Sequence, residues 1–189
     1  ITEGLVGSEM CIRDRFQWDS WDHIDINNCL NHRFPDDYAH INSIQLLADG
    51  NLIASLRGCS MVLKIDRATG TGATIWDIGG FHPSLQITGD PYGEFCGQHT
   101  ASLNSNGDLF IFDNGGHCNG SREETSGLFS RALQYSIDLN AGQAIFKRDY
   151  SLNGTYSELY SYHAHMFRSL STVSYTHLRD HETYGYLVC

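Results

Sequence analysis

Residues 43–78 read SIQLLADGNLIASLRGCSMVLKIDRATGTGATIWDI, and this stretch decides the fold class. It contains four short apolar segments, each followed by residues that favour turns. The segments are predicted as strands at Ser43–Leu47, Leu52–Leu56, Met61–Ile65 and Thr74–Ile78. The connections are rich in Asp, Gly and Asn, which suit tight turns between antiparallel strands. The stretch therefore predicts a four-stranded antiparallel meander.

The same order of strands and turns recurs downstream. The second set is predicted at Thr100–Leu103, Leu109–Phe112, Ala132–Ile137 and Ala144–Lys147. A histidine precedes each set, His40 and His99, and the two lie 59 residues apart. Four-stranded units in tandem are typical of β-propeller blades, which need a minimum of about 40–45 residues. The longer spacing predicts long loops on one face of the fold, where function usually lies.

We therefore expect an all-β fold, a β-propeller fragment of about two to three four-stranded blades. Phe16–Trp18 is interpreted as the last strand of a preceding unit, and Tyr160–Phe167 as the start of a further one. A plain antiparallel sandwich is the alternative. Two or three blades cannot close a ring, so the fragment is expected to expose sheet faces that other blades would cover.

Composition limits the classes of function. The 189 residues carry a formal net charge of −10, which argues against nucleic acid as the main partner because phosphate binding needs a basic surface. No stretch of 18 apolar residues occurs, so no membrane-spanning helix is expected. The six cysteines include no C-x-x-C pair, which argues against a zinc ribbon or a thioredoxin-type site.

The two ends of the chain do not continue the pattern of the middle. Residues 1–15 and 171–189 resemble translated sequencing-adaptor sequence and are interpreted as non-native segments. The partial propeller domain is then expected at residues 16–170, as an internal fragment of a longer protein. If the ends are foreign, Cys11, Cys189, His177 and His181 carry no functional meaning; the alternative is that the ends are native and irregular.

Candidate site residues follow from the repeat. His40 and His99, at equivalent places in successive units, are expected beside the innermost strands that line a propeller channel. Asn42 lies two residues after His40, on the same side of a strand, and Arg57 follows the second strand. Two imidazoles, an amide and a guanidinium suit a small oxyanion. The alternative is that the histidines are structural and that Arg57 forms a surface ion pair.

At these residues the chain resembles the arylsulfotransferase family, whose enzymes use aryl sulfates rather than nucleotide sulfates. The resemblance runs from about Phe16 to Tyr160 and rests on a series of motifs in order. These are HxNS at His40, SxR ending at Arg57, WxxGG at Trp76, QH ending at His99 and FDNG at Phe112, with RALQY from Arg131 also fitting.

The resemblance implies a six-bladed propeller with its active site in the channel. It implies catalytic roles for His99, as the sulfated nucleophile, and for His40 and Arg57, with Asn42 binding substrate. The implied partners are a small-molecule aryl sulfate donor and a phenolic acceptor, without a cofactor or a metal, in the periplasm or outside the cell. Asp113 and Asn114 match a family motif and are interpreted as structural supports.

The chain also departs from the family pattern. A further histidine expected upstream is not visible, since His23 lies in a different motif, and the continuation after Tyr160 differs. The fragment alone is therefore expected to be inactive even if its parent is an enzyme. A non-catalytic propeller that binds a ligand or a protein is the main alternative, and a metal site at His163 and His165 is a weaker one.

Two smaller features stay open at this point. Asp19, Asp22 and Asp25 form an acidic cluster that fits either a calcium site or, preferably, loop caps and turns. Cys96 and Cys118 flank the QH and FDNG motifs and are candidates for a disulfide if the protein is exported.

Overall fold

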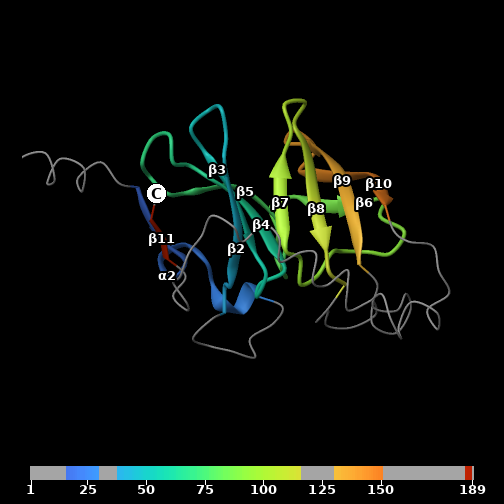
Figure 1. The fold of residues 1–189 in the computed structure, drawn as a ribbon, viewed down its shortest axis with the longest axis horizontal. Coiled ribbons are helices and arrows are strands. Elements are labelled where there is room, and N and C mark those ends of the chain that lie inside the picture. The colour runs from blue at the N-terminus through green and yellow to red at the C-terminus, as the bar shows by residue number, and fades with distance from the viewer. Residues whose placement is uncertain (1–15, 30–37, 116–129, 151–185, 189) are drawn as a thin grey trace, which may run out of the picture.

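A computed structural model describes residues 16–29, 38–115, 130–150 and 186–188. Two sheets built mainly from antiparallel strands lie side by side, and short helical segments flank the first of them (Figure 1). The expectation of an all-β propeller fragment is confirmed. Within the described residues, no helix has the length and apolar character required to span a membrane.

The first sheet is the meander that residues 43–78 predict. Its strands are β2 (Ile41–Leu46), β3 (Leu52–Leu56), β4 (Met61–Ile65) and β5 (Thr74–Gly79), paired in that order and all antiparallel. β3 and β4 have the predicted bounds. β2 begins two residues earlier than predicted, because its register against β3 shifts between Ile41 and Ser43 and lets the strand continue past the irregularity.

The second sheet repeats the meander and adds a strand. It contains β7 (Thr100–Leu103), β8 (Asp108–Asp113), β9 (Arg131–Asp138), β10 (Gln143–Tyr150) and β6 (Gln86–Thr88). β6 comes from the connection between the two sheets and pairs in parallel with β10. The sequence pattern did not predict β6, because three residues without apolar alternation do not indicate a strand. The partner of β6 also lies 57 residues downstream, so local sequence does not reveal the pairing.

The two sheets pack face to face through a shared apolar core. Ile53, Val62 and Ile78 from the first sheet contact a cluster with Leu109 and Tyr135 from the second, and all five side chains are fully buried. The inner strands β2 and β7 are also joined through a side chain. The Gln45 amide accepts a hydrogen bond from the Leu103 N–H at 2.7 Å and donates one to its carbonyl at 2.9 Å.

The first sheet is covered on its other side by the start of the described chain. β1 (Gln17–Asp19) leads into α2 (Ser20–His23) and η1 (Ile26–Asn28), and Trp18 is buried with its indole N–H on the Gly72 carbonyl at 2.9 Å. β1 pairs with β11 (Tyr186–Val188), a strand from the segment interpreted as non-native. The origin of that segment, and of residues 1–15, stays a prediction. Tyr160–Phe167 lies outside the described residues.

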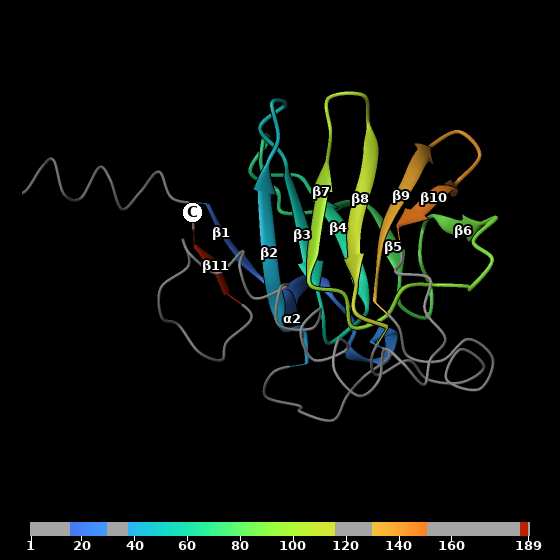
Figure 2. The ribbon, with the colours of Figure 1, turned by 45° about the vertical axis from the view of Figure 1, so that its right-hand side comes forward.

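The strands define two ends of the molecule (Figure 2). At one end β2 and β7 begin, and the connections β3–β4 and β5–β6 leave the sheet; we call this the site end. At the other end lie the short turns β2–β3, β4–β5, β7–β8 and β9–β10, and we call this the distal end. All four candidate site residues lie at the site end.

Candidate functional site

His40 and Arg57 lie next to each other where the first sheet begins. His40 directly precedes β2 and Arg57 directly follows β3, and the Arg57 N–H donates to the His40 carbonyl at 3.0 Å. His40 has φ of 44°, in the left-handed region that side chains other than glycine seldom adopt. Such a backbone is found where surrounding contacts hold a residue in one position, as functional sites require.

His99 reaches the same place from the second sheet. It directly precedes β7, its N–H donates to the Phe112 carbonyl at 2.9 Å, and the residue is 7% exposed. Burial lowers the pKa of the His99 imidazole below its ordinary value, and the positive charges of Arg57 and His40 lower it further. The fold thus brings these three residues, from two sheets, close enough to act on one another.

A lowered pKa keeps His99 neutral at a pH where an ordinary histidine is partly protonated. A neutral imidazole has a free nitrogen lone pair and is a competent nucleophile. The same two neighbours, Arg57 and His40, offer donors to an anion that lies against His99. The arrangement combines a nucleophile with anion-binding groups in one partly enclosed place.

Asn42 has a role in the protein itself. It is 6% exposed, and its Nδ2 donates to the carbonyl of Gln98, the residue before His99, at 2.8 Å. Its Oδ1 receives no hydrogen bond from the described residues. The amide N–H₂ is therefore engaged in holding the segment that carries His99. The predicted substrate-binding role of Asn42 stays a prediction.

The segment that carries His99, residues 95–99, is held by bonds from both sheets, and we call it the His99 segment. The Cys96 N–H donates to Asp113 Oδ1 at 3.0 Å, and Asn114 Nδ2 donates to the Gly97 carbonyl at 2.9 Å. On the opposite side, the Gly97 N–H donates to Ser60 Oγ of the β3–β4 turn at 3.1 Å. Asp113 and Asn114 act as the supports that the sequence analysis described.

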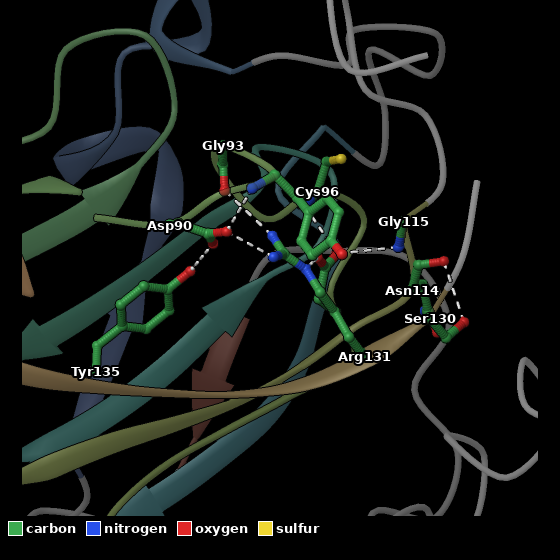
Figure 3. Close-up of polar contacts among 10 residues, drawn as sticks. Asp90, Gly93, Cys96, Asn114, Gly115, Ser130, Arg131 and Tyr135 are labelled. Carbon is green, nitrogen blue, oxygen red and sulfur yellow. Dashed lines mark hydrogen bonds and ion pairs between the residues drawn. The ribbon is translucent and has the colours of Figure 1, made fainter. Parts of the chain in front are cut away.

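Behind Asp113 lies a buried ionic cluster that sequence reasoning missed (Figure 3). The Arg131 guanidinium binds Asp113 Oδ2 at 2.9 Å and Asp90 Oδ1 at 2.6 Å, and its side chain is 0% exposed. The Tyr135 hydroxyl donates to the second Asp90 oxygen at 2.8 Å, and burial together with Asp90 raises the pKa of Tyr135. The cluster ties β9 to the loop that leads into the His99 segment.

Disulfides lie beside both parts of the site. Cys29 and Cys59 are bonded, and Cys59 is two residues after Arg57 in the β3–β4 turn. Cys96, three residues before His99, is also disulfide-bonded. Cys118, its predicted partner, lies outside the described residues. The spacing of the cysteines did not predict which of them pair, so the Cys29–Cys59 disulfide is known only from the structure.

The metal alternatives find no support in the part of the chain that the structure describes. No group of three His, Cys, Asp or Glu side chains there is arranged to hold a metal ion. Asp19 accepts from the Trp21 N–H and Asp25 from the Asn27 N–H, so two of the three clustered aspartates cap helical turns. His163 and His165 lie outside the described residues.

Comparison with known proteins gives one finding. A family model described as Arylsulfotransferase (ASST) matches residues 15–175. The match contains both sheets and every candidate site residue. No curated protein matches the chain.

Proposed function

Because the chain belongs to the arylsulfotransferase family, we propose that it transfers a sulfuryl group from a phenolic sulfate ester to a phenol through a sulfated His99. The observation that carries this proposal is the position of buried His99 beside Arg57 and His40; burial first, and these two charges second, lower the pKa of its imidazole. This arrangement favours an enzyme over a propeller that only binds.

The first half-reaction moves the sulfuryl group to the protein. A ring nitrogen of neutral His99 attacks the sulfur of the aryl sulfate, so a nitrogen–sulfur bond forms while the bond from sulfur to the aryl oxygen breaks. The donor leaves as a phenolate. Arg57 and His40 stabilise the charge on the sulfuryl oxygens and on the departing oxygen, and Asn42 holds the backbone before His99 through the Gln98 carbonyl. As in phosphoryl transfer, positioning and electrostatics supply most of the rate.

The second half-reaction returns His99 to its starting state. The oxygen of an acceptor phenol attacks the sulfur, the nitrogen–sulfur bond breaks, and the acceptor becomes the sulfate ester. The proton that the acceptor loses balances the proton that the first phenolate gains. We assign His40 to this proton exchange, since it lies beside His99 and an imidazole can both accept and donate a proton.

The disulfides support a proposed location. Cys29–Cys59 and the disulfide of Cys96 persist in oxidising compartments and are rare in the cytosol. We therefore propose that the protein works in the periplasm or outside the cell. Expression of the chain in an oxidising and in a reducing compartment, followed by thiol counting, tests this: free thiols at Cys29 and Cys59 in the oxidised preparation would contradict it.

The test of the activity uses the complete protein that contains this fragment, with 4-nitrophenyl sulfate, with and without phenol. Phenol-dependent release of nitrophenol is expected, together with a peptide that contains His99 and gains the mass of a sulfuryl group when phenol is omitted. His99→Ala should abolish both. His82→Ala is the matched control, because His82 is an exposed histidine at the same end of the molecule, and it should retain both.

Two results would overturn the proposal. One is nitrophenol release that His99→Ala leaves intact, which would assign the chemistry to another group. The other is a folded protein that releases no nitrophenol with several phenols and forms no sulfated peptide, which would favour a binding propeller.

A further inference from the structure

We infer that Gln98 is a positioning residue, whose side-chain amide fixes the Arg57-bearing turn against His99. This inference rests on the proposed function, because it assigns Gln98 the task of holding together two groups of that site. Gln98 belongs to the second unit, whereas every group that its amide contacts belongs to the first.

The amide contacts are concentrated at the base of one turn. Gln98 is 0% exposed, and its Nε2 donates to the Met61 carbonyl at 2.9 Å and to the Leu56 carbonyl at 3.2 Å. Leu56 and Met61 are paired across β3 and β4 and flank the turn 57–60 that begins with Arg57. Ser55 Oγ lies at 3.2 Å from the same nitrogen. One amide group therefore hydrogen-bonds to both β3 and β4, at the points where the turn 57–60 begins and ends.

A second contact holds the turn from within. The Gly97 N–H donates to Ser60 Oγ at 3.1 Å, and Ser60 has φ of 51°, a left-handed backbone held by its neighbours. Gly97 thus bonds to a residue within the turn 57–60, and Gln98 bonds to the residues on either side of it. Because Gln98 and His99 are adjacent in the chain, a shift of the turn relative to Gln98 is also a shift of Arg57 relative to His99.

The amide at this position has a cost as well as its contacts. Gln98 Oε1 is buried and accepts no hydrogen bond from the described residues, and such an acceptor costs free energy. An apolar side chain of similar size would remove that cost but would leave the Leu56 and Met61 carbonyls without this donor. Transfer reactions depend steeply on the distance between the nucleophile and its charge-stabilising groups, so precise attachment of Arg57 offsets that cost.

The chain offers a matched control in Gln45. This glutamine also joins the two sheets, through both hydrogen bonds to Leu103, but it does so farther along β2 and β7, away from His99. If bridging glutamines only stabilise sheet packing, Gln98→Leu and Gln45→Leu should behave alike. If Gln98 positions the site, they should differ in readouts that report on His99.

The experiment compares these two variants in the complete protein that contains this fragment. The first readout is the pKa of His99 from NMR titration of its imidazole protons, without substrate. Among the described charges, Arg57 on the turn and His40 before β2 are the ones that lower it. Gln98→Leu should move the pKa of His99 upward toward its ordinary value, because Arg57 separates from it. Gln45→Leu should leave the pKa unchanged while lowering the melting temperature.

The second readout is the rate of nitrophenol release, expected to fall at least tenfold in Gln98→Leu and to change less than twofold in Gln45→Leu. If Gln98→Leu does not fold, Ser60→Ala removes the second attachment, the Gly97–Ser60 hydrogen bond, and should shift the pKa of His99 in the same direction by less.

Equal stability losses in the two leucine variants, with an unchanged pKa of His99, would overturn the inference. A wild-type protein without transfer activity would refute the proposed function alone, because the titration still measures positioning.

Discussion

The distal end and the site end of this fold are held together in different ways. Three of the four distal turns contain a hydrogen bond between residues two apart: the Asn51 N–H donates to Asp49, the Asn106 N–H to Asn104, and the Asn140 N–H to Asp138. At the site end, the contacts of Gln98 and of Arg131 join residues 18 to 43 positions apart.

This difference separates two tasks of the chain. Local turns at the distal end set the spacing of the strands, and the contacts that join one of these turns to its neighbour are exposed or partly buried. Long-range contacts at the site end exist only after both sheets are in place, and they hold His40, Arg57 and His99 together. Substitutions should therefore have larger and more varied effects at the site end than chemically similar ones at the distal end.

The largest difference in stability is expected between loss of the buried salt bridges of Arg131 and loss of the exposed salt bridge of Lys64. Arg131→Met leaves Asp90 and Asp113 buried without their cation, and should lower the free energy of unfolding by about 3–5 kcal/mol. Lys64→Met removes the distal pair with Asp49, in which the Asp49 side chain is 46% exposed, and should cost about 0–1 kcal/mol. Urea unfolding of both variants checks this, and equal losses would break the comparison.

The next difference concerns two arginines in turns. Arg57→Gln should slow sulfuryl transfer roughly a hundredfold, or about 3 kcal/mol in the activation barrier, because a charged donor to the sulfuryl oxygens is lost. Arg67→Gln alters a distal turn, where the guanidinium contacts the Gly50 carbonyl at 3.4 Å, and should leave the rate unchanged. Initial rates of nitrophenol release measure both. A comparable loss in the two variants would mean that charge in general, rather than position, matters.

A smaller difference is expected between two glycines with positive φ. At Gly107 (φ 83°) an added Cβ meets nothing within 4 Å, so Gly107→Ala should cost only the backbone strain, about 1–2 kcal/mol. At Gly79 (φ 82°) the Cβ would lie 2.2 Å from the Ser60 carbonyl oxygen, so Gly79→Ala should cost clearly more. Melting temperatures rank the two. The opposite order would show that the Ser60 turn yields easily, against the rigidity argued for the site end.

The smallest expected effects are on the pH dependence of the free energy of unfolding, which should differ between a group at the site end and one at the distal end. The pKa of His99 is lowered in the folded protein, so the unfolded state binds more protons, and the free energy of unfolding should fall as the pH drops below about 6.5. The pKa of Asp49 is lowered to about 2 by Lys64, so its contribution is present above about 4 and is lost as the pH falls toward 2.

These two windows begin at different pH values and can be assigned by substitution. His99→Gln should remove the upper part of the pH dependence, and Asp49→Asn a small lower part, since that exposed pair is strongly screened. Urea titrations across the pH range measure both slopes. An upper slope that persists in His99→Gln would assign it to another histidine.

Much of the distal half of the fold could be predicted from sequence. β3, β4 and β7 have the predicted bounds, because each is a short apolar run that borders a distal turn with its own local hydrogen bonds. β6 was missed, since its pairing depends on Gln143–Ile145 and not on its own composition. The sequence pattern therefore predicted elements well where their causes are local.

The candidate site was predicted in part for the same reason. His40 and His99 occupy equivalent places in a repeat, which sequence can display. The roles of Gln98 and Arg131 depend on which carbonyls and carboxylates surround them after the sheets pack, and no spacing along the chain encodes that. Asn42 was predicted in part: the sequence pattern predicted its place beside His40, but not its hydrogen bond to the Gln98 carbonyl.

The parallel pairing of β6 has a consequence for the order in which the molecule forms during synthesis. β6 leaves the ribosome before β7, β8 and β9, yet its partner β10 is made last among these strands. Residues 86–88 must therefore remain without this partner until the second sheet is nearly complete. Once paired, β6 covers the outer edge of β10, an edge that would otherwise be open to strands of other molecules. A short strand placed out of sequence thus closes the sheet late and protects it from aggregation.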